Sequence, residues 1–172
     1  MALPLHFTGK TVVVRSMTPE DQTTFQHWLA MSEELRTLID APSIPTMEDQ
    51  MRWLERSQEP DRCFFSILTY PEGVLIGNAG FVAIDREQKS AQFRITIGNP
   101  DSWGKGYGSE VLSLLLRFGF EEMGLERIWL RVLPGNTRAI RMYERAGLIP
   151  VGDDDGKIRM AIDRSSFLSR TV

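Results

Sequence analysis

One stretch, residues 92–118, constrains the fold of this chain more than any other. Residues 95–98, Ile-Thr-Ile-Gly, suit the end of a strand, and residues 99–101 suit a short turn. From Ser109 onward the sequence favours a helix with one apolar face. The segment in between has three glycines at alternate positions, Gly104, Gly106 and Gly108. These glycines therefore stand where a loop leads into a helix.

The start of this predicted helix is a candidate anion-binding site. The first backbone N–H groups of a helix have no partner within it, and the helix dipole adds about half a positive charge there. Glycine lets a ligand approach the backbone closely and permits backbone angles that other residues resist. We therefore expect a phosphate or pyrophosphate to bind at this loop. The alternative is that the glycines only form a tight turn between strand and helix.

Two known phosphate-binding loops match this stretch poorly. A P-loop ends in Gly-Lys-Ser/Thr, but here Gly106 follows Lys105, which excludes that loop. A dinucleotide-binding fingerprint requires a third glycine where this chain has Ser109. It also requires an acidic residue at the end of the next strand, where this chain has Arg131. The fingerprint is therefore disfavoured.

Length and composition indicate one globular domain over residues 1–172 with a single core. The formal net charge of −3 implies no general attraction to nucleic acid or to an anionic membrane. Cys63 is the single cysteine, and no group of Cys and His has metal-ligand spacing, so no disulfide and no metal are expected. Residues 1–6 lack a signal-peptide pattern, and no segment approaches about 18 apolar residues. A cytoplasmic enzyme or binding protein fits best.

The predicted order of elements along the chain is β, α, α, β, β, β, α, β, α, β, β. Strands are expected at residues 11–15, 63–70, 74–84, 91–97, 126–132, 148–152 and 157–163. Helices are expected from Thr18, from Thr46, at 106–124 and at 136–146. Neighbouring strands with short turns run antiparallel, whereas a long connecting helix allows the strands on either side of it to run parallel. The predicted fold class is α/β (α+β mixed), with a mixed, mostly antiparallel sheet of six to seven strands and helices on both faces.

A second candidate constellation lies on the predicted helix at 136–146. Asn136 has a ready structural role as the N-cap of this helix. Tyr143 follows seven residues later, two turns along and on nearly the same face. Taken alone, Asn136 is explained as a cap and Tyr143 as a packed aromatic residue.

The two stretches together resemble the cofactor motifs of the GCN5-related N-acetyltransferases (GNAT). Residues 103–108, Trp-Gly-Lys-Gly-Tyr-Gly, are similar to that family's pyrophosphate loop, Gln/Arg-x-x-Gly-x-Gly/Ala, with Trp103 where Arg or Gln is commoner. Residues 136–148 are similar to its second motif, Asn-x-x-Ala-x-x-x-Tyr-Glu-x-x-Gly-Leu/Phe, and follow the loop by one strand, as in that family. The loop looks most like the branch that contains ribosomal-protein-alanine and polyamine N-acetyltransferases.

This resemblance implies that acetyl-coenzyme A is the co-substrate. It would lie in a V-shaped opening between the parallel fourth and fifth strands, here residues 92–97 and 126–132, with its pyrophosphate on the backbone amides of 104–109. Its pantetheine arm would pair with the edge of the fourth strand, where the amide of Ile97 would polarise the thioester carbonyl. Tyr143 is the implied catalytic residue, donating a proton or hydrogen bond to the leaving thiolate. The implied cofactor-binding residues are Ile95, Thr96, Ile97, Trp103, Gly104, Lys105, Gly106, Tyr107, Gly108, Ser109 and Asn136.

The general base is not identified by the sequence. Many relatives carry Glu where this chain has Gln92, and a neutral amide cannot take the proton of the acceptor amine. Glu33, Glu34 and Asp40 are candidates for this role or for attracting the amine. A solvated acidic helix end explains them equally well, so no base is assigned.

We therefore expect an N-acetyltransferase that moves an acetyl group from acetyl-coenzyme A directly to a primary amine. The acceptor could be a protein N-terminus, a polyamine or another small amine; no nucleic acid or membrane partner is expected, and a homodimer stays open. A non-catalytic acyl-CoA-binding or sensor domain is the alternative. The short turn at 153–156, Asp-Asp-Asp-Gly, predicts an open and mildly acidic entrance to the acceptor groove, which would suit a cationic amine.

Overall fold

The computed structural model describes residues 6–170. Its strands are β1 (His6–Thr8), β2 (Val12–Ser16), β3 (Cys63–Thr69), β4 (Leu75–Asp85), β5 (Ser90–Ile97), β6 (Arg127–Val132), β7 (Ile149–Asp154) and β8 (Lys157–Asp163). Its α-helices are α1 (Pro19–Met31), α2 (Glu33–Leu38), α3 (Met47–Arg56), α4 (Tyr107–Arg117), α5 (Thr137–Arg145) and α6 (Arg164–Arg170). The stretch without a signal-peptide pattern, residues 1–6, lies outside the described residues except for His6.

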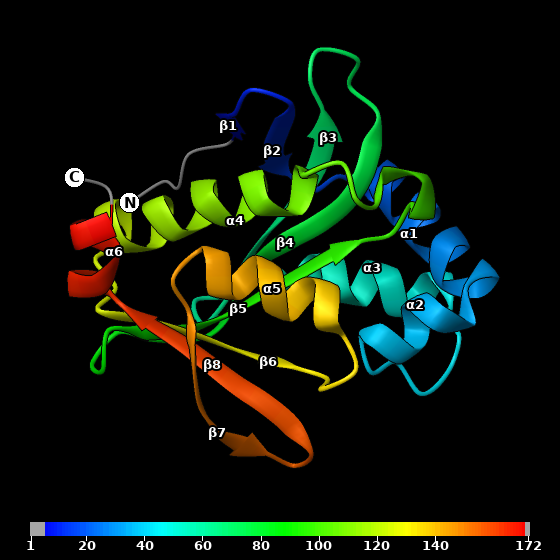
Figure 1. The fold of residues 1–172 in the computed structure, drawn as a ribbon. Coiled ribbons are helices and arrows are strands. Elements are labelled where there is room, and N and C mark those ends of the chain that lie inside the picture. Colours follow the sequence, from blue (N-terminus) through cyan, green and yellow to red (C-terminus); the bar gives the residue numbers. More distant parts are fainter. Residues whose placement is uncertain (1–5, 171–172) are drawn as a thin grey trace.

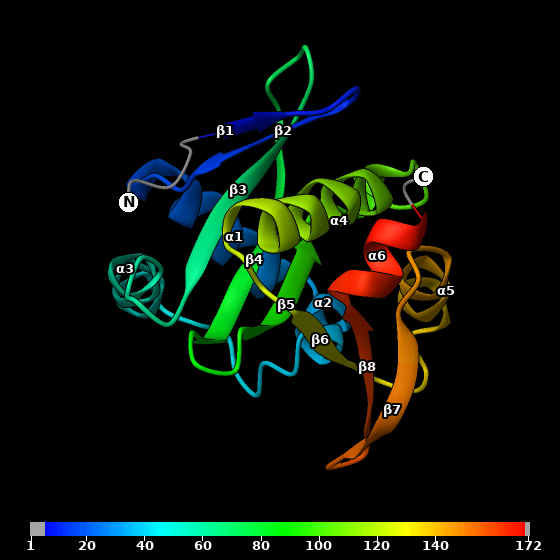
Figure 2. The same cartoon turned by 90° about the vertical axis from the view of Figure 1, so that its left-hand side faces the viewer.

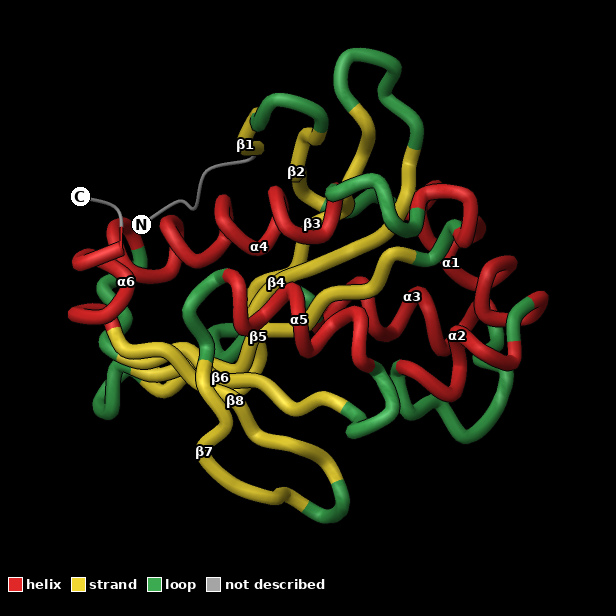
Figure 3. The backbone as a smooth tube through the Cα atoms, viewed as in Figure 1, coloured by secondary structure: helices red, strands yellow, loops and turns green. Residues whose placement is uncertain are grey.

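The strands form one open sheet in the order β1-β2-β3-β4-β5-β6-β8-β7 (Figure 3). Every neighbouring pair is antiparallel except β5 and β6, which run parallel. The mixed, mostly antiparallel fold class is therefore confirmed. The sheet has eight strands rather than six or seven, because the three-residue β1 is too short to show the alternation that identifies a strand. The short helices α2 and α6 were not predicted from the sequence for the same reason.

Helices cover both faces of the sheet, as expected (Figure 2). On one face α4 packs against the larger core through an apolar stripe: Val111, Leu112, Leu115 and Leu116. On the other face, a smaller core joins Phe25 of α1 and Trp53 of α3 to Phe64 of β3. Side chains from both faces of the sheet are thereby buried, which holds its strands in fixed positions.

A buried carboxylate connects α1 to the sheet. Asp21 accepts hydrogen bonds from Arg15 Nη1 of β2 at 2.7 Å and from Ser66 Oγ of β3 at 2.6 Å, and it closes a capping box with Thr18. Burial would raise the pKa of the Asp21 carboxyl, but the hydrogen bonds from Arg15, Ser66 and Thr18 outweigh it and lower the pKa. The carboxylate therefore stays charged at neutral pH and positions α1 over β2 and β3.

β5 and β6 separate soon after they begin to pair. Residues 90–92 pair in parallel with 127–129, and from there the strands diverge, with α5 in front of the gap in Figure 1. β5 continues to Ile97 alongside β4, where the two backbones approach closely. A Cβ on Gly77 would lie only 2.0 Å from the carbonyl oxygen of Thr96. This divergence is the V-shaped opening that was predicted, and it leaves one edge of β5 facing a cavity.

Two negative findings concern the described part of the chain. No helix within residues 6–170 is long and apolar enough to cross a membrane. Within the same residues, no three His, Cys, Asp or Glu side chains lie close enough together to hold a metal ion.

Candidate active site

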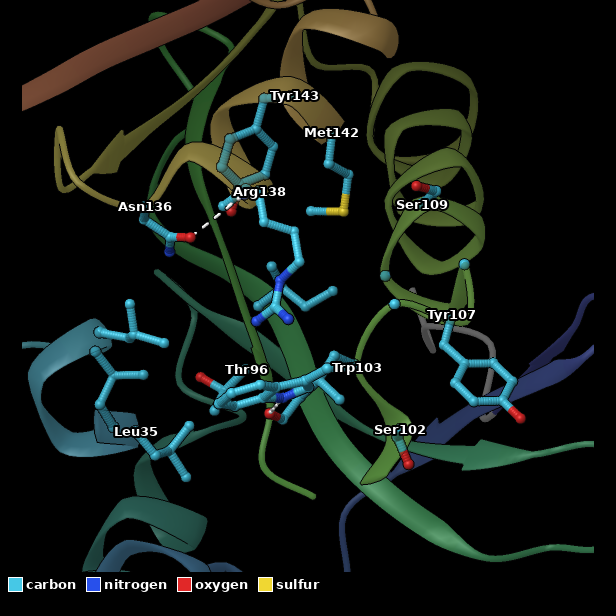
Figure 4. Close-up of a pocket in the computed structure, with 18 of the residues that line it drawn as sticks. Leu35, Thr96, Ser102, Trp103, Tyr107, Ser109, Asn136, Arg138, Met142 and Tyr143 are labelled. Atoms are coloured by element: carbon cyan, nitrogen blue, oxygen red, sulfur yellow. Dashed lines mark hydrogen bonds between the residues drawn. The ribbon is translucent and has the colours of Figure 1, made fainter. Parts of the chain in front are cut away.

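A cavity of about 350 Å³, here called the glycine-loop cavity, lies between the loop before α4, the edge of β5 and α5 (Figure 4). Among the predicted site residues, only Lys105 does not line it, and the Lys105 side chain is exposed. The predicted residues that the structure brings together here are Ile95, Thr96, Ile97, Trp103, Gly104, Gly106, Tyr107, Gly108, Ser109, Asn136 and Tyr143. Two motifs that are almost 30 residues apart in the chain thus meet at one cavity.

The loop before α4 presents backbone to this cavity. Gly104 and Gly106 have left-handed φ angles of +74° and +86°, which a residue with a Cβ adopts only with strain. A Cβ built on either would meet no atom of the described chain within 4 Å, so both face open space. Gly106 is the N-cap of α4, and no side chain in residues 6–170 caps this helix. The N–H groups of its first turn are therefore left for an anion.

Trp103 fixes this loop to the end of β5. Its Nε1–H donates a hydrogen bond of 2.7 Å to the carbonyl oxygen of Ile97. The guanidinium of Arg138 extends from α5 over the same indole, with its central carbon 4.4 Å from the ring centroid (Figure 4). This arrangement is a cation–π contact, and it brings a positive charge into a cavity whose loop already favours anions.

Asn136 and Tyr143 reach the cavity from the two ends of α5. Asn136 caps the helix, its Oδ1 accepting a hydrogen bond from the N–H of Ala139 at 3.3 Å (Figure 4). Tyr143 is only 7% exposed, and burial raises the pKa of its phenol. Its hydroxyl forms no hydrogen bond with any residue of 6–170. The phenol is therefore neutral at physiological pH and has an unused proton to donate.

Two further cavities lie next to the glycine-loop cavity along β5. The aromatic cavity, about 250 Å³, is lined by Phe25, Trp28, Trp53 and Phe64 and bordered by Arg94. The basic cavity, about 200 Å³, is lined by Arg94, Arg131, Lys157 and Asp40 together with Gln92 and Tyr143. Ile39 and Thr96 line all three cavities. Tyr143 borders both the glycine-loop cavity and the basic cavity, so a molecule in either cavity can lie next to the same side chain.

The carboxylates considered as general bases are not available at this junction. Glu33 and Glu34 are exposed on α2 and line none of the three cavities. Asp40 does line the basic cavity, but it accepts a hydrogen bond of 2.6 Å from Lys157 Nζ. This hydrogen bond and the charge of Lys157 lower the pKa of the Asp40 carboxyl. A carboxyl with a lowered pKa is a weaker proton acceptor than an ordinary one.

The prediction of an acidic entrance to the acceptor groove is wrong. Asp153 accepts a hydrogen bond from the N–H of Gly156 within the β7–β8 turn. Asp154 lies 3.9 Å from the Nε of Arg131 and 3.8 Å from an Nη of Arg159. The side chains of β6 and β8 thus neutralise Asp154, and the charged lining of the nearby cavity is mostly positive. These cross-strand neighbours depend on strand register, which the sequence did not reveal.

Several cavity residues were not predicted. From α5 they are Arg138, Ala139, Met142 and Arg145, from the segment before α4 Ser102, and from α2 and the residue after it Leu35, Leu38 and Ile39. Ala139 lies three residues after Asn136 and four before Tyr143, so helical periodicity could have indicated it. The residues of α2 carried no such signal, because only the packing of α2 against the end of β5 brings them here.

Comparison with known proteins agrees with this geometry. The family model of the acetyltransferase (GNAT) domain matches residues 11–149. The SPbeta prophage-derived uncharacterized N-acetyltransferase YokL of Bacillus subtilis (strain 168) is 26% identical over 148 residues, covering 86% of this chain and 81% of that protein. The spermidine N(1)-acetyltransferase of Vibrio cholerae is 32% identical over 108 residues, covering 56% of this chain and 61% of that protein.

The fold is shared with solved structures as well. The crystal structure of a spermidine N-acetyltransferase from Vibrio cholerae in complex with CoA and spermine matches with a TM-score of 0.83 and 19% identity. The match covers 93% of this chain and 99% of that chain. With a sequence identity of 19%, this match shows that the two proteins share a fold. It does not show that they share the side chains of the site.

Proposed function

This chain belongs to the GNAT family of acetyltransferases, and on that premise we propose that it transfers an acetyl group from acetyl-coenzyme A to a primary amine. The family resemblance found in the sequence is thereby confirmed. One observation carries the proposal: Tyr143 borders both the glycine-loop cavity and the neighbouring basic cavity. Two substrates need such an arrangement if they react directly with each other.

The glycine-loop cavity fits the cofactor in three respects. The open space at Gly104 and Gly106 allows phosphate to reach the backbone N–H groups at the start of α4. Arg138 adds a cation at the same end of the cavity. The edge of β5 at 95–97 offers backbone groups that can pair with an extended amide-containing arm. When bound, acetyl-coenzyme A would supply the acetyl group as a thioester.

Tyr143 would stabilise the departing sulfur. A thiol has a pKa of about 8.5, and burial raises the pKa of Tyr143 above its usual value of about 10. Complete proton transfer from the phenol to the thiolate is therefore uphill by at least about 2 kcal/mol. A hydrogen bond from the neutral hydroxyl avoids this cost, so we assign Tyr143 the role of a hydrogen-bond donor to the sulfur as negative charge develops on it.

Direct transfer is favoured over an acyl-enzyme. Cys63 lies on β3, is 1% exposed and lines none of the three cavities. Burial raises the pKa of its thiol to about 11, so the reactive thiolate is scarce at neutral pH. The acceptor amine would instead attack the thioester carbon itself. The location in the cytoplasm and the homodimer stay predictions of the sequence.

The alternative function is a non-catalytic domain that binds acyl-coenzyme A. The low basicity of Asp40 and the neutral Gln92 favour it, because both leave the acceptor amine without a strong base. Incubation with acetyl-coenzyme A and a panel of amines, followed by measurement of free thiol, separates the two functions. Acceptor-dependent thiol release supports the transferase. Tight binding of acetyl-coenzyme A without thiol release for any amine supports the binding domain.

The substitution Trp103→Phe should weaken the binding of coenzyme A about fivefold. It removes the N–H that ties the loop to Ile97, a hydrogen bond that contributes about 1 kcal/mol. Isothermal titration calorimetry measures the affinity. Trp129→Phe is the matched control, because Trp129 stacks on Arg159 and does not line the glycine-loop cavity. Equal affinities for the Trp103→Phe and wild-type proteins would show that the loop is positioned without the indole.

A further inference from the structure

We propose that the acceptor is a small amine that also carries a carboxylate and an apolar side chain, and that Arg94 binds the carboxylate. This inference rests on the proposed acetyl transfer and adds the chemical class of the acceptor. It concerns β5 around Arg94 and Thr96, where the aromatic cavity and the basic cavity share lining residues.

Arg94 lies at the boundary of these two cavities. It lines both of them, and so does Thr96, which is about 7 Å further along the strand. Thr96 also lines the glycine-loop cavity, and Tyr143 lines the basic cavity. A molecule of the size of an amino acid can therefore contact Arg94 while its nitrogen faces the junction beside Tyr143.

The charges around Arg94 favour an anion. Its guanidinium forms no hydrogen bond or ion pair with any residue of 6–170, whereas Asp40 already binds Lys157 and Asp154 lies between Arg131 and Arg159. Arg94 reaches solvent, yet its neighbours desolvate it enough to lower its pKa, and the charges of Arg131 and Arg62 add to this effect. A bound carboxylate would supply the missing counter-charge through the planar fork of donors that arginine presents.

The same charges disfavour a polyamine. A molecule such as spermidine would bring two or three positive charges beside Arg94, Arg131 and Lys157. Among residues 6–170, the carboxylates that line the aromatic cavity and the basic cavity are Asp40, which Lys157 neutralises, and Asp49, which closes the capping box of α3 and lies 3.5 Å from Arg52. Like charges at this distance repel, and the repulsion is larger where water is partly excluded. The acceptor of the spermidine acetyltransferase relative is therefore a poor match for this site.

The aromatic cavity accounts for the apolar side chain. Phe25 and Trp28 of α1 form one part of its wall, and Trp53 of α3 packs edge-on against Phe64 to form another. Its volume of about 250 Å³ is enough for an apolar or aromatic group, since an apolar cavity of about 150 Å³ already accommodates benzene. Arg94 lies at the border of this cavity, so a carboxylate bound to Arg94 would lie next to an apolar group inside the cavity. An apolar α-amino acid has these two groups next to each other.

The reaction is balanced without a further reactant. The lone pair of the neutral amine forms the new C–N bond with the thioester carbon, and the C–S bond breaks with its electron pair leaving on sulfur. The sulfur becomes the free thiol of coenzyme A by taking up one proton, and the amine nitrogen releases one proton to solvent. The products would be an N-acetyl amino acid and coenzyme A.

The first test compares matched acceptors at fixed acetyl-coenzyme A by measuring free thiol. L-Phenylalanine and L-phenylalaninamide differ mainly in the carboxylate, and spermidine represents the polyamines. We expect kcat/KM for L-phenylalanine to exceed that for the amide at least tenfold, with spermidine lower still. A preference for the amide or for spermidine would overturn the proposal.

The second test removes the guanidinium. Arg94→Gln should lower kcat/KM for L-phenylalanine 10- to 100-fold and make the acid and the amide equivalent, while Arg94→Lys should retain part of the preference. Arg117→Gln, an exposed arginine on α4, is the matched control and should behave as the wild type. An unchanged preference for the acid in Arg94→Gln would overturn the role of Arg94.

Calorimetric titrations keep this inference separate from the proposed function. L-Phenylalanine is titrated into the wild-type and Arg94→Gln proteins in the presence of coenzyme A, which requires no turnover. Binding of the acid that depends on Arg94, together with absence of thiol release, would contradict the transferase but support the carboxylate site. Thiol release with other amines, together with no binding of L-phenylalanine, would support the transferase but contradict the acceptor class.

Discussion

Replacing Tyr143 with phenylalanine should lower the rate of acetyl transfer about 10²-fold, within the usual range for the loss of one hydrogen-bond donor to a developing charge. The ring lies in the larger core and keeps its packing in the variant, so only the hydroxyl is removed. Because burial keeps the phenol protonated, Tyr143 can donate a hydrogen bond into the glycine-loop cavity over the whole neutral pH range. Single-turnover measurement of thiol release isolates the chemical step from product release.

The affinity of the Tyr143→Phe protein for coenzyme A should remain close to that of the wild type. Tyr70→Phe, an exposed tyrosine after β3, is the matched control for the loss of a phenolic hydroxyl. If Tyr143→Phe transferred acetyl at the wild-type single-turnover rate, the residue would be a packed aromatic with no part in the chemistry.

Gly106→Val should weaken the binding of coenzyme A at least tenfold while the protein remains folded. Gly106 has a φ of +86°, and a branched residue at this angle is strained by roughly 1–2 kcal/mol. The added side chain would also enter the open space through which a phosphate reaches the first turn of α4. Calorimetric titration with coenzyme A measures the effect, and circular dichroism reports the fold.

Gly73→Val provides the control for strain alone. Gly73 has a φ of +74° and an equally open surrounding, but it lies in the turn between β3 and β4 and lines none of the three cavities. Its substitution should lower the thermal stability without changing the affinity for coenzyme A. Similar affinities for the Gly106→Val and Gly73→Val proteins would remove the glycine loop from the binding site.

Much of the glycine-loop cavity was predictable because its signals are local. The alternate glycines from 104 to 108 and the switch to a helical pattern at Ser109 occur within a few residues of one another. The same holds for the N-cap Asn136 and for Tyr143, which lies two turns further along the same helix. Such features depend on backbone angles and helix periodicity, which are properties of short segments.

The family motifs also placed these two segments one strand apart along the chain, as the structure has them. The parallel pairing of β5 and β6 follows from the long helical connection between them. Three-residue β1 and six-residue α2 could not be predicted in this way, because they are too short to show a period.

The sequence by itself thus determined the fold class, the glycine loop and the tyrosine that faces it. The tertiary structure alone decided the charge of the basic cavity. Arg94, Arg131 and Lys157 come from three different strands and meet only because of the register of the sheet, which also brings Arg131 and Arg159 to Asp154. Electrostatic interactions depend on distances in space, which the sequence does not give. The three adjacent aspartates at 153–155 therefore suggested an acidic entrance, whereas the charged side chains that line the basic cavity are mostly positive.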